Sequence, residues 1–269
     1  MKRLLTALAL AGAAGLFLWG WTARTEASAH IPPGTQPVDL APLLRGAQPA
    51  PQTEALLFQQ TGLGPTGLYA VWRQEGAQGV LAFQRQLFAP AAWQCGYGTL
   101  LTRQDVLASP VRLAPLEAGD ILVTPASHCL GWRNGHAALV VDAQTGRTLE
   151  CGPDGAFFGL ASAWGDRASF LVLRLAGASG ETRARIAREA PQALAGASYS
   201  PTVGLFSPKL PGGQITATQC AHLVWAAFAR QGYDLDATGG WLVTPRDIAL
   251  SPLLEVVQVY GLPPGQRWP

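Results

Sequence analysis

The 269-residue sequence predicts an α+β fold, in which an antiparallel sheet carries a helix with a cysteine in its first turn. Short apolar runs follow one another between residues 120 and 175 with turn signals between them, which is typical of antiparallel strands. Residues 214–232 then combine helical spacing of apolar residues with start and stop signals. A mostly helical region precedes both features, so helices are expected on either side of the strands in the chain order.

The first 29 residues have the form of a secretory signal peptide. Lys2 and Arg3 precede an almost uncharged apolar run over residues 4–21, and Ala-Ser-Ala at residues 27–29 forms a cleavage site. Cleavage predicts a mature chain that begins at His30 in the periplasm, the cell envelope or the extracellular space. The alternative is an uncleaved membrane anchor, because the run approaches the shortest spanning length of about 17 residues.

Composition limits the partners that the protein can have. Without residues 1–29 the chain keeps 16 basic and 16 acidic residues, so its net charge is 0. No charge run or basic stripe is present, which excludes a nucleic-acid partner. With 48% apolar residues the chain can bury one sizeable core. We therefore expect four parts: a signal peptide over 1–29, a linker over 30–52, a helical extension over 53–112 and the main domain over 113–269.

The linker and the extension are read from their turn and helix signals. Pro- and Gly-rich residues 30–52 predict a tether with one helical turn near Val38–Leu44. In the extension, Glu54–Gln60 reads as a helix that a Gly-rich break ends, and Pro65 opens the next helix. Thr102–Asp105 resembles a capping box that starts a further helix.

The main domain predicts strands first and helices second. A polar loop, Pro125–Gly135, separates the first two strands, and a helix over Glu181–Leu194 is expected to be interrupted at Pro191. A last apolar segment, Leu253–Val259, is placed in the same sheet. The predicted strands before that segment are Asp120–Thr124, His136–Val141, Arg147–Glu150 and Ser169–Leu175.

Cys220 lies in the first turn of the predicted cysteine helix. Thr218 is the predicted N-cap and Gly232 the predicted C-cap. Unpaired backbone N–H groups and the positive end of the helix dipole favour a thiolate at this position, and the thiolate is the nucleophilic form. The alternative is a core cysteine, because free cysteine is among the most buried residue types.

His136 and Glu150 are the candidates to assist a thiol. A cysteine hydrolase needs an imidazole that moves protons and a third group that holds the ring. His136 opens an apolar strand, and Glu150 ends the next strand. Their even separation places both on one face of an antiparallel pair, but direct opposition centres the hairpin on Ala143. Because the turn signal centres on Gln144, a bulge or an offset is required. The alternatives are a core histidine and a surface carboxylate.

At this point the chain resembles the circularly permuted, NlpC-type papain-like cysteine hydrolases, in particular their YiiX-like bacterial branch, in which the histidine strand precedes the cysteine helix. The resemblance spans about residues 54–251, and the order and spacing of the motifs carry it rather than any single motif. The matching stretches are Gln60–Gly64, Gly119–Leu122, Gly135–Val140, Leu149-Glu150, Gly196–Tyr199, Gln219-Cys220 and Val243–Asp247.

The resemblance implies a role for each of five residues. Cys220 would be the nucleophile, His136 the general base and acid, and Glu150 the group that orients the imidazole. Tyr199 and Gln219 would lie at the substrate or oxyanion site. The implied reaction is hydrolysis of an amide bond through an acyl-enzyme, with peptidoglycan stem peptides as the first substrate. No cofactor is implied.

Two departures leave the substrate open. Ala221 stands where this branch commonly has Ser, and His222 follows it. The string Gln-Cys-Ala-His-Leu-Val is similar to one in the lecithin:retinol acyltransferase-like enzymes, which share the permuted fold and act on lipid acyl groups. Lipid-acyl hydrolysis or transfer is therefore the alternative activity, and a non-catalytic cell-surface binding module is the alternative class. His222 lies well around the helix from Cys220, so we interpret it as structural or rim-facing.

The histidines and cysteines of the sequence also have to be considered as metal ligands or as disulfide partners. His128, Cys129, His136 and Cys151 are zinc-type ligands, but their spacing matches no usual pattern, so no metal is expected. Because the strand that ends at Glu150 returns towards the loop that carries Cys129, Cys129–Cys151 is the favoured disulfide. The competing pair is Cys95–Cys129.

Overall fold

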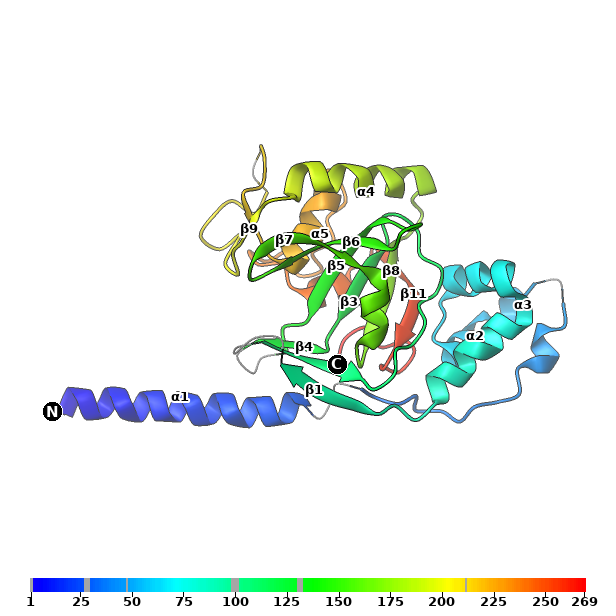
Figure 1. Cartoon of the computed structure of the whole chain (residues 1–269), viewed down its shortest axis with the longest axis horizontal. Coiled ribbons are helices and arrows are strands. Elements are labelled where there is room, and N and C mark those ends of the chain that lie inside the picture. Colours follow the sequence, from blue (N-terminus) through cyan, green and yellow to red (C-terminus); the bar gives the residue numbers. More distant parts are fainter. Residues whose placement is uncertain (1, 27–29, 47, 98–101, 130–132, 211) are drawn as a thin grey trace.

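The computed structural model describes residues 2–26, 30–46, 48–97, 102–129, 133–210 and 212–269. Its centre is a six-stranded antiparallel sheet in the order β11-β8-β3-β5-β6-β7, with helices on both faces (Figure 1). The α+β class and the antiparallel pairing are therefore confirmed. The strands are β3 (Ile121–Thr124), β5 (His136–Asp142), β6 (Arg147–Gly152), β7 (Gly155–Leu160), β8 (Phe170–Leu175) and β11 (Leu254–Tyr260).

Five of these six strands coincide with predicted segments, and β7 was missed. β7 is an edge strand, and its residues Phe157, Phe158 and Leu160 are exposed. Its run Gly-Ala-Phe-Phe-Gly-Leu has no polar–apolar alternation, which is the signal that identifies a half-buried strand. The predicted closing segment is β11, which pairs with β8 at the opposite edge.

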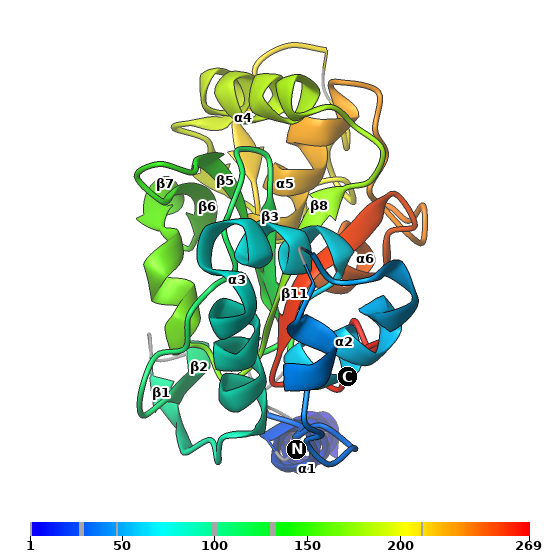
Figure 2. The same ribbon diagram turned by 90° about the vertical axis from the view of Figure 1, so that its right-hand side faces the viewer.

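The helices flank the sheet. Figure 2 shows α2 and α3 in front of the sheet, on the side opposite α4 and α5. The α-helices are α1 (Lys2–Glu26), α2 (Glu54–Thr61), α3 (Pro65–Phe88), α4 (Gly180–Leu194), α5 (Cys220–Ala229) and α6 (Pro245–Leu250), and the 3-10 helices are η1 (Ala41–Leu44), η2 (Pro51–Thr53) and η3 (Ala161–Asp166).

The helix signals at Glu54–Gln60 and Pro65 are confirmed, and the predicted interruption at Pro191 is wrong. α2 ends at Gly62, whose φ of 70° is left-handed, and Pro65 opens α3. α4 runs on through Pro191 instead of being interrupted there. Pro191 stands near the end of α4, where buried Ala190 and Leu194 pack against the sheet side of the core and hold the last turn in place.

Alternating side chains of the sheet divide the core into two layers. Ile121, Val123 and Leu139 point towards α4 and α5, together with buried residues of those helices. Leu122 and Val140, which alternate with them, join a second cluster with residues of η1, α2, α3 and η3. The region expected as a helical extension thus shares a hydrophobic cluster with the main sheet. The segment expected as a linker also contributes, because Leu40 and Leu44 are buried in that cluster.

A second, three-stranded sheet lies where a helix start and a polar loop were predicted. Its order is β1-β2-β4, formed by Trp93–Tyr97, Thr102–Leu107 and Ser127–Cys129. The expected capping box at Thr102–Asp105 is therefore wrong, and the expected polar loop contains β4. The carboxylate of Asp105 accepts from His128 across the sheet, at 2.7 Å from Nε2, and is not available to cap a helix.

Neither predicted disulfide forms, and none of the four cysteines is bonded to another. Cys129 pairs with Thr102 in the three-stranded sheet, whereas Cys151 lies on β6 of the main sheet. The Sγ of Cys151 faces α5 and lies 3.5 Å from the carbonyl oxygen of Thr218. Separation into two sheets directs the two side chains to different neighbours, which the strand order in the sequence did not indicate.

The start of the chain forms one long helix. α1 exposes apolar side chains such as Leu8 and Leu16, and the predicted cleavage site at residues 27–29 lies outside the described residues. Of the helices described, none combines the length and the hydropathy that a membrane crossing requires.

Candidate active site

Cys220 is the first residue of α5, beside a pair of two-residue strands. β9 (Ser198–Tyr199) and β10 (Ala217–Thr218) run parallel, and β10 leads directly into the helix. The N-cap is Gln219, not the predicted Thr218: Gln219 Oε1 accepts from Ala221 N at 2.8 Å and lies 3.5 Å from the Cys220 thiol. Thr218 continues the strand, so its backbone is extended before the cap. Cys220 is buried, with 9% of the residue's surface exposed.

His136 is the first residue of β5, and the glycine before it fixes its position. Gly135 has a φ of +73°, and a Cβ there would lie 2.6 Å from the carbonyl oxygen of Thr124 on the neighbouring strand β3. Only glycine combines that backbone with that approach. The imidazole consequently projects at the end of the sheet with 17% of its side chain exposed.

Glu150 reaches His136 diagonally across β5 and β6. Ala138 pairs with Glu150, so His136 is displaced by two residues on the same face, and a bulge lies between Val140 and Asp142. The expected bulge or offset is thus confirmed. Diagonal neighbours of this kind are about 7 Å apart at Cβ, which a glutamate side chain spans. Oε2 of Glu150 lies 2.7 Å from His136 Nε2.

The carboxylate of Glu150 is buried, and both of its oxygens have hydrogen-bond partners. Oε1 accepts from the Thr148 hydroxyl at 2.6 Å and from Trp164 Nε1 at 3.3 Å. Gly159 on β7 makes room for it, since a Cβ at that position would lie 2.5 Å from Oε1. Burial acts to raise the pKa of Glu150, but hydrogen bonds and charge from His136, with Thr148 and Arg167, outweigh it and lower that pKa. Glu150 is therefore an anion at neutral pH.

The thiol of Cys220 is the third group of the candidate site, after the imidazole of His136 and the carboxylate of Glu150. It is the strongest of the influences that raise the pKa of the His136 imidazole, and Nδ1 is the ring nitrogen left for it because Nε2 faces Glu150. Burial opposes the charged imidazolium, yet the contacts with Cys220 and then Glu150 raise the pKa of His136 to about 9. A thiol, an imidazole and a carboxylate in this sequence can generate a nucleophile and move its proton.

Tyr199 and Gln219 stand beside the thiol in different ways. Tyr199 pairs with Thr218 in the parallel β9–β10 ladder and is 38% exposed. Its pKa is raised by burial and then by the neighbouring thiols, first that of Cys220. Both functional groups of the Gln219 amide are engaged, because Nε2 donates to Val243 O while Oε1 caps the helix. Gln219 thus holds the start of α5.

The other two histidines of the main domain are structural in their contacts. His222 is fully buried, and its ring nitrogens bond Thr218 Oγ1 at 2.8 Å and Lys209 O at 2.7 Å. Burial lowers its pKa, so it stays neutral. This supports the structural interpretation of His222 over a rim-facing one. His128 bonds Asp105 in the three-stranded sheet, away from the thiol of Cys220.

Two residues of the site were not predicted from the sequence. The Trp164 ring stacks on His136 with centroids 5.6 Å apart and planes at 16°. The Arg167 guanidinium lies over the Trp164 ring, 4.3 Å from its centroid. Arg167 stands just before the apolar strand β8, and a charge beside an apolar strand is the same signal that identified Glu150. Nothing in the sequence relates Trp164 to His136.

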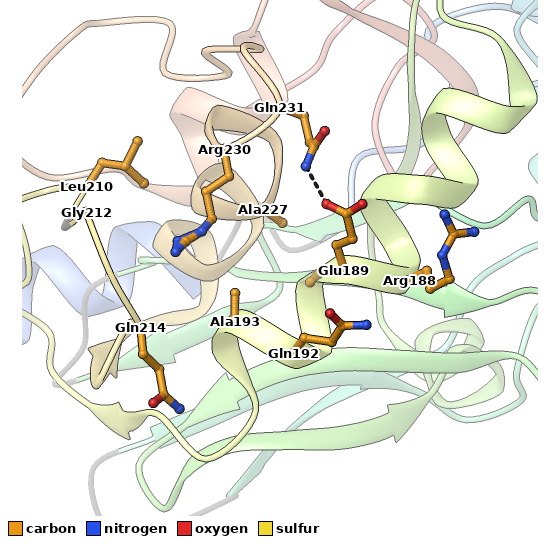
Figure 3. Close-up of a pocket in the computed structure, with 11 residues that line it drawn as sticks. Arg188, Glu189, Gln192, Ala193, Leu210, Gly212, Gln214, Ala227, Arg230 and Gln231 are labelled. Atoms are coloured by element: carbon orange, nitrogen blue, oxygen red, sulfur yellow. Dashed lines mark hydrogen bonds between the residues drawn. The ribbon is translucent and has the colours of Figure 1, made fainter.

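Metal-binding groups and cavities are two further features that can mark a functional site. Among the residues that the structure describes, no group of three or more His, Cys, Asp or Glu side chains could hold a metal ion. A cavity of about 960 Å³ lies between α4 and the end of α5, lined by residues such as Arg188, Gln192 and Arg230 (Figure 3). None of the five predicted site residues lines it.

Comparison of the chain with models of protein families, with curated proteins and with solved structures finds no match. A functional conclusion consequently depends on the geometry around Cys220 and on the motifs of the sequence. The 2.7 Å contact of His136 with Glu150 and the influence of Cys220 on the pKa of His136 are its starting point.

Proposed function

We propose that this protein is an exported thiol hydrolase that cleaves amide bonds through an acyl-enzyme on Cys220. The observation that carries the proposal is the 2.7 Å contact between His136 and the buried carboxylate of Glu150, beside the Cys220 thiol that raises the pKa of the same imidazole. Two neighbouring strands, β5 and β6, and the later helix α5 supply these groups, and a purely structural role requires no such alignment at a partly exposed edge.

The geometry supports the following sequence of steps. The Cys220 thiolate attacks the substrate carbonyl, and the resulting tetrahedral oxyanion is stabilised by the backbone N–H of Cys220 at the start of α5. The N–H of Ala221 is occupied by Gln219, so Gln219 supports the helix start rather than the oxyanion. His136 gives its proton to the leaving amine, and the acyl thioester forms. His136 then takes a proton from water, which hydrolyses the thioester and releases the acid.

The fold and the substrate are proposed from the resemblance. The order histidine strand, carboxylate strand, cysteine helix agrees with a circularly permuted papain-like domain of the NlpC type. For an exported member of that group, peptidoglycan stem peptides are the substrate we infer. These peptides offer amide bonds outside the cytoplasm, where the predicted signal peptide would direct the chain.

Contacts at His30 support a mature chain that begins there. Its Nδ1 lies 2.8 Å from Ala168 O, its ring lies 5.4 Å from that of Tyr260, and Ile31 N donates to Gly261 O at 2.9 Å. The body of the protein thus holds the chain from His30 onward. Intact-mass measurement of exported protein tests this prediction, and a mass that retains residues 1–29 contradicts cleavage.

Exposed apolar side chains near the cysteine helix favour lipid acyl groups as a second candidate substrate. Trp241 is 72% exposed and Phe206 is 83% exposed, far more than is usual for side chains of this size. The loop of Trp241 touches the site through Val243, whose carbonyl oxygen accepts from Gln219. An apolar rim at this place suits an acyl chain better than a polar peptide.

The test compares the two substrate classes directly. Purified protein is incubated with stem peptides released from peptidoglycan and, separately, with short- and long-chain acyl esters, and the products are identified by mass spectrometry. We expect amide cleavage by the wild type and none by Cys220→Ala, with Cys95→Ala as the matched cysteine control. Ester cleavage alone would favour the lipid activity. Equal product with wild type and Cys220→Ala, or none with any substrate, would favour a binding module.

A further inference from the structure

We propose that Arg167 is a positioning residue of this site, a buried cation that holds Trp164 against His136 and favours the thiolate of Cys220. The inference rests on the proposed function, because it assigns a role in activating that nucleophile. It concerns a residue outside the line of thiol, imidazole and carboxylate.

Backbone and side-chain contacts fix Arg167 in one place. Its N–H donates to Trp164 O at 3.2 Å, and its backbone bridges to Val106 of β2. The guanidinium covers the Trp164 ring at 4.3 Å and donates through Nη1 to the Ser127 hydroxyl on β4 at 3.2 Å. Arg167 is only 8% exposed. The side chain therefore joins η3 to the three-stranded sheet, beneath the site.

Trp164 contacts both the imidazole of His136 and the carboxylate of Glu150. Its ring stacks on His136, and its Nε1 donates to Glu150 at 3.3 Å. A guanidinium over an indole ring is a favourable cation–π contact, which is stronger when it is desolvated. Fixing Trp164 thus restricts both the ring of His136 and the carboxylate of Glu150.

The charge of Arg167 has no direct counter-ion. No carboxylate lies within ion-pair distance of it in the described part of the chain, and its Nε is buried without a hydrogen-bond partner. Burying such a cation costs free energy, since arginines buried for stability are normally paired. Burial lowers the pKa of Arg167 to about 10, so the group is still a cation at neutral pH.

The surrounding charges show where this cation acts. Against the dominant effect of burial, the nearby Glu150, Cys220 and Asp166 act to raise the pKa of Arg167, and Arg167 in turn acts to lower the pKa of His136. It therefore favours the anions of the site. Three more ionisable groups lie behind it in the three-stranded sheet and its loop, and they pair with one another: Asp105, His128 and Arg133.

Alkylation of Cys220 tests the inference without a natural substrate. Iodoacetamide reacts with the thiolate, so its rate at Cys220 is followed against pH by peptide mass spectrometry. Arg167→Gln removes the charge, and we expect its alkylation profile to move to higher pH by about 0.5 to 1 unit. Arg167→Lys keeps the charge and should stay within a few tenths of the wild type. The exposed Arg112→Gln is the matched control and should not move the profile.

Two outcomes overturn the inference. One is an unchanged profile for Arg167→Gln, and the other is an equal shift for the lysine and glutamine variants, which indicates a structural role alone. If Arg167→Gln does not fold, Ser127→Ala loosens the guanidinium, and a profile identical to the wild type then counts against the proposal. Failure of the proposed function looks different: His136→Ala would leave the wild-type alkylation rate unchanged.

Discussion

Two histidine–carboxylate pairs lie on consecutive strands of this molecule, and only one of them belongs to the candidate site. His136 on β5 meets Glu150, and His128 on β4 meets Asp105. Both pairs have 2.7 Å between Nε2 and the nearest oxygen, and both carboxylates are buried. By distance and burial of the acid alone the pairs are indistinguishable.

The two pairs differ in the third group that lies beside each of them. Nδ1 of His136 is left for the Cys220 thiol, and 17% of the His136 side chain is exposed. The Asp105 carboxylate instead accepts from Arg133 at 3.0 Å, and only 3% of the His128 side chain is exposed. A histidine–carboxylate pair thus becomes a candidate catalytic unit when a nucleophile lies beside the ring and the ring is partly exposed, whereas a buried pair whose carboxylate also binds an arginine forms a structural cluster.

Removal of each histidine should give the largest contrast. We expect His136→Ala to lower the rate of acyl-enzyme formation by about 10³-fold or more, because it removes the group that moves the proton. His128→Ala should change the rate per folded molecule by less than about threefold and lower the free energy of unfolding by about 1–3 kcal/mol, since it leaves Asp105 partly unpaired. Single-turnover kinetics and urea unfolding of both variants measure the contrast. Equal rate losses would contradict it.

Neutral replacements of the two acids sharpen the comparison. Glu150→Gln keeps the shape but weakens the hold on the ring, so we expect a rate loss of about 10²- to 10⁴-fold. Asp105→Asn breaks a buried ion pair with Arg133 and should cost about 3 kcal/mol of stability. The same two assays apply. A Glu150→Gln enzyme with the wild-type rate would remove the orienting role.

A glycine substitution tests the space around the Glu150 carboxylate. Gly159→Ala places a Cβ 2.5 Å from Oε1, so the carboxylate must shift from His136. A displacement of this size is expected to lower the rate by about tenfold. Gly213→Ala meets no atom within 4 Å and serves as the control. A wild-type rate in Gly159→Ala would show that the carboxylate position matters little.

The smallest expected effect is the pH dependence of stability. The pKa of His136 is raised to about 9, so its contribution is fully present below its unfolded pKa of about 6.5 and is lost as pH rises through 9. His222, with its lowered pKa, contributes above that unfolded value and loses its contribution as pH falls. Urea unfolding from pH 5 to 10 should therefore show His136→Gln costing less stability at pH 10 than at pH 6. A constant cost would contradict the raised pKa.

The parts predicted from sequence are those that local patterns determine. Strand alternation and helix caps are properties of neighbouring residues, so β5, β6, α2 and the start of α5 were placed within a few residues. The offset between His136 and Glu150 followed from the position of the turn alone.

What the sequence did not reveal depends on contacts between distant segments. Trp164 and Arg167 reach the site only because η3 folds back beside β5 and β4. Asp105 read as a helix cap because its carboxylate has the same local pattern in either role, and His128, which decides between them, lies on another strand. Cys129 and Cys151 likewise lie in two different sheets, which the sequence did not indicate.

The central claim is that Cys220 is a nucleophile that His136 activates. Labelling with a thiol-reactive acyl probe, followed by intact mass and peptide mapping, tests it on the wild type, Cys220→Ala and His136→Ala. Burial, and then the neighbouring Cys220, raise the pKa of the Cys151 thiol to about 12, so Cys151 should remain unlabelled near neutral pH. We predict one acyl group on Cys220 in the wild type, none in Cys220→Ala and labelling slower by about 10²-fold or more in His136→Ala. Labelling of Cys220 at the same rate with and without His136 would contradict the claim.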